Sequence, residues 1–268
     1  MDVSALIGEY LESNEEHKER NDRLYVTDVG RCPRSVAYDL MGAKKRTLSK
    51  QKAANKRFMF RLAHHVETDV GQALAHARIE YISQHPLEID DHENWGGRPD
   101  FVIVRNGEMA YGIEVKSLHP NAFRFELPKK EHLYQTTIYK EYTKTPEDWL
   151  LWYGDRGGAN TPQQFVVSSL LRDDCARLMD ELDAVRAALP DIPPPAPKVL
   201  KFTDKIRGVA QYKKVRLVPD WHCEYCDHRE ASCFPDMRTE TWAEWTNGWV
   251  PTRKANVDAL SAFGVALS

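Results

Sequence analysis

Residues 97–116 read GRPDFVIVRNGEMAYGIEVK, and this pattern predicts a β-hairpin. Two short runs rich in β-branched and aromatic residues flank Asn106-Gly107, a dipeptide that strongly favours a tight turn between antiparallel strands. Side chains alternate between the two faces of a strand, so Glu114 and Lys116 should project to the same side. The turn should also bring Asp100 back close to Glu114. The stretch therefore predicts two carboxylates and one ammonium group at one place on a sheet.

Two neighbouring carboxylates and a lysine suit the hydrolysis of phosphodiesters. Asp100 and Glu114 can share a hard cation such as Mg²⁺ or Mn²⁺, which would act as a Lewis acid. Lys116 would orient or activate the attacking water and offset charge on the phosphate. The alternative is an ordinary exposed ion pair, because Glu-x-Lys alone occurs by chance in most chains. Gly97-Arg98-Pro99 and the hairpin favour the catalytic interpretation.

Length and composition set mild limits on the class of protein. The chain has 268 residues, 42% of them hydrophobic and 29% charged, as in a globular protein with one sizeable core or two modest ones. No apolar run approaches the roughly 18 residues that cross a bilayer, and residues 1–16 lack the layout of a signal peptide. We therefore expect a cytoplasmic protein without a membrane partner. The sequence gives no indication of the oligomeric state.

Four of the five cysteines form a pattern, which consists of Cys32, Cys223, Cys226 and Cys233. Cytosolic thiols are kept reduced, so this set favours metal binding over disulfides. Four thiolates can hold a structural Zn²⁺ or a [4Fe–4S] cluster, and the spacing does not separate the two. His222 and His228 flank the group and could complete a zinc site without Cys32. Cys175 lies outside the pattern, and on a predicted helix we expect a small apolar filler.

The net charge of −3 argues against a nucleic-acid partner, because non-specific DNA affinity comes mostly from neutralised phosphates. The distribution of charge reverses this interpretation. Between Asp39 and Glu67 the chain has no acidic residue but eight basic ones. Such a run is usually a solvated face, but in an acidic protein it predicts a phosphate-binding track. The candidate DNA-binding residues are Lys44, Lys45, Arg46, Lys56 and Arg57.

The periodicity of the chain predicts helices and short strands in a mixed order. The predicted helices are 2–20, a segment from Thr27-Asp28 to Leu40, 52–84, 131–142 and 172–188. The predicted strands are 87–89, 98–104, 111–116, 149–153 and 164–169. Residues 190–197 contain five prolines and should form a stiff connector. We expect an N-terminal helical segment over 1–50, a core over 51–189 and a cysteine-rich region with a tail over 190–268.

Several of these motifs, in this order, resemble one nuclease family. Pro99-Asp100 with Glu114-Val115-Lys116 resembles the PD-(D/E)XK signature, and Gln135 with Tyr139 resembles the QxxxY motif of its RecB-like branch. Cys32-Pro33-Arg34 with the three later cysteines resembles the iron–sulfur arrangement of the Cas-four exonucleases and their phage and helicase-linked relatives. The resemblance runs from about Thr27 to Phe234.

The resemblance implies an α/β, restriction-endonuclease-like core with a mixed central sheet flanked by helices. An iron–sulfur region would join the N- and C-terminal segments. It implies a metal-dependent DNA exonuclease that acts on single strands or duplex ends, with partners in recombination, repair or CRISPR-type adaptation. Asp100 and Glu114 would then be metal ligands and Lys116 the catalytic lysine. Gln135 and Tyr139 would orient the DNA backbone or the lysine, although a face that packs on the sheet is the alternative.

The family places a further metal ligand on the helix before the sheet, and here the choice is open. Glu67 ranks first because a third carboxylate suits Mg²⁺, and His64 or His65 is the alternative. The resemblance favours [4Fe–4S] over Zn²⁺ at the cysteines. Two other functions remain: a structure-specific endonuclease of the same superfamily, and a zinc-stabilised DNA-binding protein without turnover.

Overall fold

The computed structural model describes residues 10, 22–92, 94–124, 127–192, 198–206, 209–219, 226–228, 232–233 and 240–244. The chain divides into two compact units, Met1–Arg31 with Thr47–Leu189 and Cys32–Arg46 with Pro190–Ser268. Within the described residues, no helix combines the length and the apolar character needed to cross a membrane. The predicted helix 2–20 lies almost wholly outside the described residues, as does most of the proline-rich connector.

The first unit is built on a mixed five-stranded sheet of order β2-β4-β5-β6-β7, in which β5 and β6 are parallel and the other neighbours antiparallel. Its strands are β2 (Tyr81–Ser83), β4 (Phe101–Arg105), β5 (Glu108–Leu118), β6 (Trp149–Asp155) and β7 (Gln163–Val167). Its helices are α3 (Lys50–His76), α4 (Lys130–Thr143) and α5 (Arg172–Ala187), with short 3-10 turns at Val26–Asp28, Pro120–Arg124 and Ser169–Leu171. A separate parallel pair joins β1 (Leu24–Tyr25) to β3 (Trp95–Gly96).

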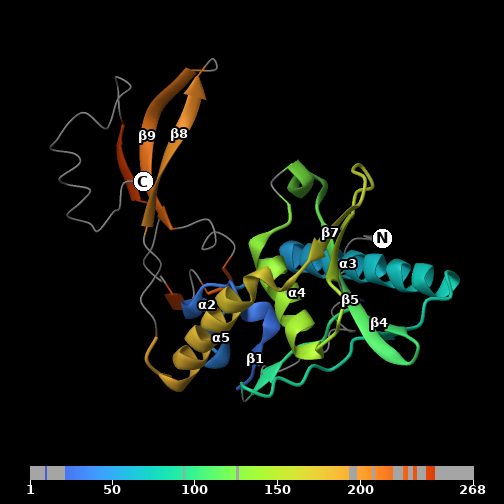
Figure 1. The fold of residues 1–268 in the computed structure, drawn as a ribbon. Helices are drawn as coiled ribbons and strands as arrows, with labels where there is room; N and C mark the ends of the chain where they lie inside the picture. Colours follow the sequence, from blue (N-terminus) through green and yellow to red (C-terminus); the bar gives the residue numbers. More distant parts are fainter. Residues whose placement is uncertain are drawn as a thin grey trace. The chain divides into compact units, whose positions relative to one another are not determined.

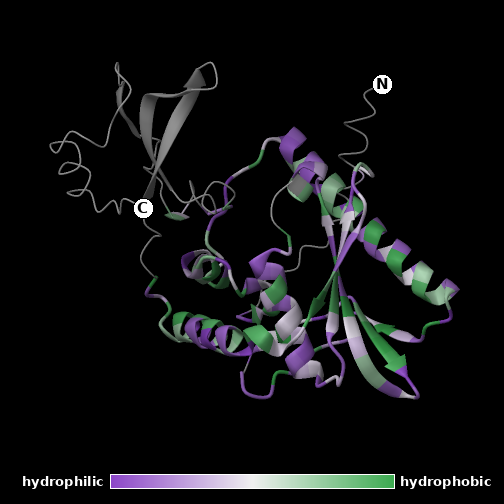
Figure 2. Ribbon diagram, turned by 45° about the horizontal axis from the view of Figure 1, so that its top comes forward, coloured by the Kyte–Doolittle hydropathy of each residue, from purple (hydrophilic) through white to green (hydrophobic). Residues whose placement is uncertain are grey.

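Helices α3 and α4 cover opposite faces of this sheet (Figure 1). On the α3 side, Leu74 packs in a cluster with Phe101, Ile103, Ile113 and Val115. The cluster on the α4 side contains Leu118, Leu151, Tyr153 and Val167. Helices α3 and α5 carry apolar and polar residues on different sides, as the green and purple of their ribbons in Figure 2 show, whereas α4 buries every residue from Tyr134 to Tyr139. The apolar sides bury against the sheet or, for α5, against α4.

The predicted hairpin is confirmed. Asn106 and Gly107 both have positive φ, 57° and 82°, as a type I′ turn requires. The register pairs Phe101 with Ile113 and Val102 with Gly112. The N-terminus of α3 is also explained locally, because the Ser49 hydroxyl accepts a hydrogen bond from the Lys52 N–H at 3.3 Å.

Three sequence predictions are wrong: two helices differ in one boundary each, and one predicted strand does not form. The long helix ends at His76 rather than at residue 84, because the following Tyr81–Ser83 pairs with β4. Leu87-Glu88-Ile89 forms no strand; Leu87 donates a single backbone hydrogen bond to Gly97, and the preceding Pro86 has no N–H to donate. The helix expected from Thr27-Asp28 begins at Pro33, where the ring fixes a helical φ at the first position.

The second unit contains α2 (Pro33–Leu40) and a three-stranded antiparallel sheet of order β10-β9-β8. Its strands are β8 (Lys198–Ile206), β9 (Val209–Pro219) and β10 (Glu240–Glu244). The end of α2 and the loop after it bind the segment around residues 226–233: the Arg46 N–H donates to the Asp227 carbonyl at 2.7 Å. The Tyr38 hydroxyl donates to the Ser232 carbonyl at 3.0 Å. Segments about 190 residues apart thus form one unit.

Gly112→Ala tests how tightly the hairpin packs on β6. A Cβ at Gly112 would lie 2.4 Å from ring carbons of Trp149, which is fully buried. We expect this variant to lose about 3 kcal/mol of unfolding free energy, the upper end of the usual cost of overpacking, measured by urea denaturation. Adding Trp149→Leu should recover part of the loss, since the smaller side chain makes room. If the stability losses of the two single variants simply added up in the double variant, the clash between residue 112 and Trp149 would be contradicted.

Candidate active site

The hairpin brings the predicted carboxylates and lysine together. One Asp100 oxygen accepts a hydrogen bond from the backbone N–H of Val115 at 2.8 Å, which fixes this carboxylate against β5. Lys116 Nζ donates to Glu114 Oε1 at 2.6 Å. The Glu114 side chain is only 2% exposed. Ile113 and Val115 pack on the other face of the sheet, so the predicted alternation is confirmed.

Two ionised carboxylates at this place would carry more negative charge than one lysine offsets. Burial, and then the negative charge of Glu114, raise the pKa of Asp100 to about 8. Burial also raises the pKa of Glu114, although Lys116 opposes this rise. Within the described residues, Glu114 Oε2 is buried and has no hydrogen-bond partner. A buried oxygen without a donor, beside a second carboxylate, is what a cation would satisfy.

This donor set fits Mg²⁺ or Mn²⁺ with few protein ligands. In the described part of the chain, no three His, Cys, Asp or Glu side chains are grouped closely enough to hold a metal ion by themselves. Mg²⁺ commonly binds through one or two carboxylates and keeps several waters. Asp100 and Glu114 therefore meet its requirement without a third protein ligand.

Of the helix candidates, Glu67 lies nearest to these carboxylates. The Gln84 amide donates to Glu67 Oε1 at 2.8 Å and to Asp100 Oδ1 at 3.2 Å, so one side-chain amide joins the two acidic groups. His64 is 76% exposed, and its Nδ1 lies 3.5 Å from Glu67 Oε2. His65 is also exposed. The metal-binding role of each of these residues stays a prediction.

Gln84 is a site residue that sequence reasoning missed. Its φ of 52° lies in the left-handed region, and its N–H donates to the Asp100 carbonyl at 3.1 Å. The sequence placed it at the end of a predicted helix, where no such contact is expected. The long-range pairing of β2 with β4 places Gln84 beside Asp100.

Helix α4 presents Gln135 and Tyr139 toward the carboxylates. Both side chains are buried, and Gln135 Nε2 donates to the Tyr139 hydroxyl at 3.1 Å. Burial, and then the negative charge of Glu114, raise the pKa of Tyr139 above its usual value, so this hydroxyl keeps its proton. The Tyr139 ring also packs against Trp149 of the sheet, with ring centroids 6.2 Å apart. The role that the QxxxY resemblance implies for this pair stays a prediction.

His132 is a second residue that sequence reasoning missed. It precedes Gln135 by three residues and so shares its helix face, which is the signal that could have found it. Its Nδ1 lies 2.9 Å from the Tyr153 hydroxyl. Burial, and then the positive charge of Lys116, lower the pKa of His132 to about 3. His132 is therefore neutral at physiological pH and lies within electrostatic reach of Lys116.

The five candidate DNA-binding residues fall in both units. Lys56 and Arg57 lie on α3 of the first unit, whereas Lys44, Lys45 and Arg46 belong to the second. Lys45 Nζ is 2.7 Å from Asp39 and Arg46 Nε is 3.4 Å from Asp227. These two cations therefore offset carboxylates of their own unit, which weakens their contribution to a free phosphate track.

Three of the four patterned cysteines are described, and all lie in the second unit. Cys32 is the N-cap residue of α2, and Arg34 Nε donates to Cys233 Sγ at 3.1 Å. Burial raises the pKa of the Cys233 thiol, Arg34 opposes this rise, and Cys226 and Cys32 add to it. The described residues contain no group of three such side chains close enough to hold a metal ion, so the metal-binding role of these cysteines stays a prediction. Cys223 and His222 lie outside the described residues.

His228 is buried beside this thiol group, with both ring nitrogens near other acceptors. Its Nε2 lies 3.0 Å from Asp39 Oδ1 and its Nδ1 lies 3.4 Å from the Lys44 carbonyl. The Asp39 carboxylate also pairs with Lys45 at 2.7 Å. His228 thus ties the C-terminal segment to the loop after α2.

Comparison with known proteins supports the fold. No protein-family model and no curated protein matches the chain. Among solved structures, SSO0001 matches with 19% identity over 88% of this chain and 98% of that chain, at a TM-score of 0.54. The alkaline exonuclease LHK-Exo from Laribacter hongkongensis matches with 10% identity over 63% and 90%, at a TM-score of 0.43. LHK-Exo in complex with dAMP matches with 10% identity over 62% and 89%, at 0.40.

The likeness to SSO0001 shows a shared fold. It agrees with the mixed five-stranded sheet flanked by helices, so the predicted α/β architecture is confirmed. The predicted division into segments 1–50, 51–189 and 190–268 stays a prediction.

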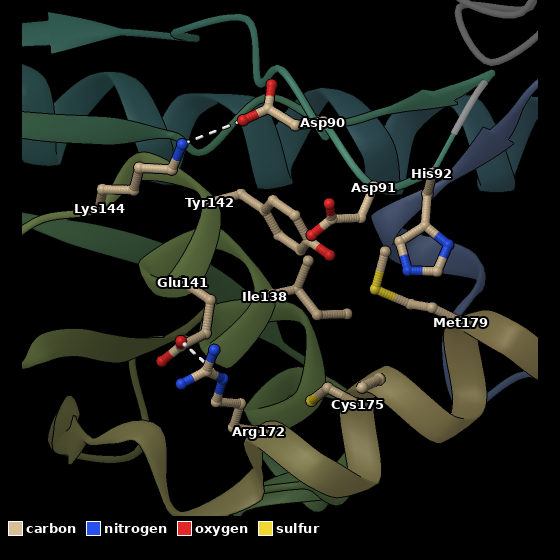
Figure 3. A pocket seen from close by; sticks show the side chains of 11 residues that line it. Asp90, Asp91, His92, Ile138, Glu141, Tyr142, Lys144, Arg172, Cys175 and Met179 are labelled. Carbon is tan, nitrogen blue, oxygen red and sulfur yellow. Dashed lines mark hydrogen bonds and ion pairs between the residues drawn. The ribbon is translucent and has the colours of Figure 1, made fainter.

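A separate cavity of about 450 Å³ lies between α4, α5 and the loop at Asp90 (Figure 3). Its acidic rim is partly paired: Lys144 Nζ lies 3.0 Å from Asp90 and Arg172 Nε lies 3.4 Å from Glu141. Its floor includes Cys175, which is buried on α5 as a filler would be. This cavity is formed by the far side of α4 and shares no lining residue with the carboxylate site.

Asp100→Asn should stabilise the protein in a chelating buffer. Asparagine keeps the shape and an acceptor for the Val115 N–H. The raised pKa of Asp100 means that at neutral pH this carboxyl must take up a proton on folding, and asparagine removes that cost. We expect the free energy of unfolding to rise by about 1–2 kcal/mol and the Tm by about 3–6 °C, measured by thermal unfolding in EDTA. Adding Mg²⁺ should raise the Tm of the wild type more than that of the variant. A variant less stable than the wild type in EDTA would contradict the strain assigned to this carboxylate pair.

Proposed function

We propose that this protein is a metal-dependent DNA exonuclease that acts on single strands or duplex ends. The observation that carries the proposal is the partly buried Asp100 beside the buried Glu114. Glu114 Oε1 accepts from Lys116, while its Oε2 has no donor among the described residues. Structural ion pairs rarely leave a buried carboxylate oxygen unsatisfied, whereas sites that bind a cation do. The preference for ends rests on the resemblance to RecB-like and Cas-four nucleases.

In this proposal Asp100 and Glu114 hold Mg²⁺ or Mn²⁺, and Glu67 or a histidine of α3 stands nearby. The bound ion supplies a Lewis acid for the scissile phosphate. Lys116 is held by Glu114 at 2.6 Å, so its remaining N–H groups are oriented toward the attacking water or a phosphate oxygen. Gln135 fixes the Tyr139 hydroxyl, which stays protonated and can donate to the DNA backbone.

We further propose that Cys32, Cys223, Cys226 and Cys233 hold a [4Fe–4S] cluster. Three of these cysteines belong to the second unit, and Arg34 donates to the sulfur of Cys233, which suits an anionic thiolate ligand. A structural Zn²⁺ is the alternative. The role of the cluster would be to tie the two ends of the unit, with recombination, repair or CRISPR-type adaptation as the setting.

The test is degradation of DNA by anaerobically purified protein. Single-stranded and duplex DNA labelled at either end and a covalently closed circle are incubated with Mg²⁺, Mn²⁺ or EDTA. We expect cation-dependent loss of linear DNA alone, and the label that disappears first gives the polarity. Cleavage of circles would favour the endonuclease, and binding without cleavage under every cation would favour a DNA-binding protein.

A further inference from the structure

A second feature of the first unit is connected to Asp100 through Gln84. It is a cavity of about 540 Å³, formed between β1, β3 and the loop at Pro86. Cavities of about 300–1,000 Å³ hold small ligands in proteins. The residues that matter for its chemistry are Arg23, Tyr25, Gln84, Leu87, Arg98 and Tyr139.

Two lining residues connect the cavity to the proposed catalytic centre. Gln84 donates to Asp100 at 3.2 Å, and the negative charge of Glu114 acts on Tyr139. Arg98 precedes Asp100 by two residues. Gly97 lets the backbone approach, because a Cβ there would lie 2.9 Å from the Tyr139 ring. A ligand in this cavity would therefore lie next to the cation proposed at Asp100.

The cations of the cavity suit a phosphate. The side chain of Arg98 is exposed and, within the described residues, makes no hydrogen bond or ion pair. Arg23 donates from Nε and Nη2 to the Trp95 carbonyl at 3.0 and 2.6 Å, which uses two of its five N–H groups and fixes its guanidinium. A preorganised guanidinium loses little entropy when it binds an anion.

The remaining walls suit a nucleobase. The Tyr25 ring is 38% exposed, and the buried Leu87 with Pro86 offers an apolar surface. Bases of single strands stack on exposed aromatic side chains, whereas bases within a duplex are stacked and paired already. Aromatic and basic side chains in one small cavity match an unpaired nucleotide.

We propose that this cavity holds one unpaired nucleotide of a DNA strand, next to the phosphate at Asp100. Its base lies against Tyr25 and Leu87, and its phosphate lies against Arg98 and Arg23. The inference deepens the proposed nuclease function and rests on it for the identity of the substrate as DNA. It makes single-stranded DNA, or a frayed end, the substrate.

The experiment measures binding without turnover. Fluorescence anisotropy is recorded with labelled decathymidylate and with a blunt, fully paired hairpin, in EDTA, for the full chain. Tyr25→Ala should weaken binding of the single strand about five- to 100-fold, as expected when one stacked base is lost. Tyr25→Phe keeps the ring and should bind within about twofold of the wild type. Arg98→Ala should lower the salt slope by about 0.7, and Arg177→Ala on α5 is the matched control that should not.

Each outcome separates the cavity from the nuclease function. Cleavage by the wild type with unchanged binding by Tyr25→Ala and Arg98→Ala would overturn the cavity proposal and leave the nuclease. Weakened binding by these variants, without cleavage by the wild type, would support the cavity and overturn the nuclease. A wild type that fails to bind decathymidylate, or an equal loss on the paired hairpin, would overturn the single-strand proposal. Thermal unfolding shows that each variant is folded.

Discussion

Lys116→Ala should lower the rate of DNA cleavage about 100- to 1,000-fold, the usual cost of removing one preorganised donor from an active site. In the native protein, Lys116 Nζ is held 2.6 Å from Glu114 and is mostly shielded from solvent. Its loss removes the ammonium group beside the scissile phosphate and leaves a buried carboxylate without its partner. Steady-state cleavage of single-stranded DNA at saturating Mg²⁺ gives the rate.

Lys144→Ala is the matched control for this change. Lys144 is 72% exposed and pairs with Asp90 at 3.0 Å, on the other side of α4. Its removal should leave the rate within about twofold, because an exposed pair contributes little. Circular dichroism at the assay temperature distinguishes a catalytic loss from unfolding. Undiminished cleavage by folded Lys116→Ala would rule out the proposed lysine chemistry.

Cys233→Ser should cause the largest loss of stability. If four thiolates hold a cluster, this change removes one thiolate ligand and replaces the sulfur acceptor of Arg34 with a hydroxyl. Structural metal sites supply about 10–16 kcal/mol of binding free energy, which is more than the net stability of most domains. We expect the anaerobic protein to lose its iron and acid-labile sulfide and the second unit to lose its cooperative thermal transition.

Cys175→Ala separates a ligand effect from a general thiol effect. Cys175 is 4% exposed on α5 and lies in the first unit. Its change should leave the iron and sulfide contents unaltered. Zinc in place of iron and sulfide in the wild type would replace the cluster proposal by the structural zinc site. Full metal content in Cys233→Ser would contradict both.

The parts of the site that the sequence predicted are those set by local pattern. Asn106-Gly107 and the alternation around Glu114 act over a few residues, so the hairpin and its carboxylates were predictable. Gln84 was not, because its position depends on the pairing of Tyr81 with Ile103, a contact between segments that are 22 residues apart. His132 carries no motif of its own; its three-residue spacing from Gln135 is the one local signal, and its contact with Tyr153 needed the fold.

The same distinction holds for the thiols. Cysteine spacing predicted a set, whereas the contacts that organise it, such as Arg34 with Cys233, needed the fold. Leu87 and Ile89 show the opposite error, since they are buried as a strand pattern predicts but form no ladder. The apolar pattern predicts which side chains are buried. A strand forms only where the backbone also pairs with a neighbouring strand.

The separation of Arg34 and Cys233 by 199 residues affects how the protein folds during its synthesis on the ribosome. At about 5–20 residues per second, the ribosome needs roughly 10–40 s to make the chain between them. The sheet of the first unit can form during this interval, before the residues around Cys233 that contact α2 have been synthesised. A chain that ends early would thus contain a folded first unit without an assembled thiol region.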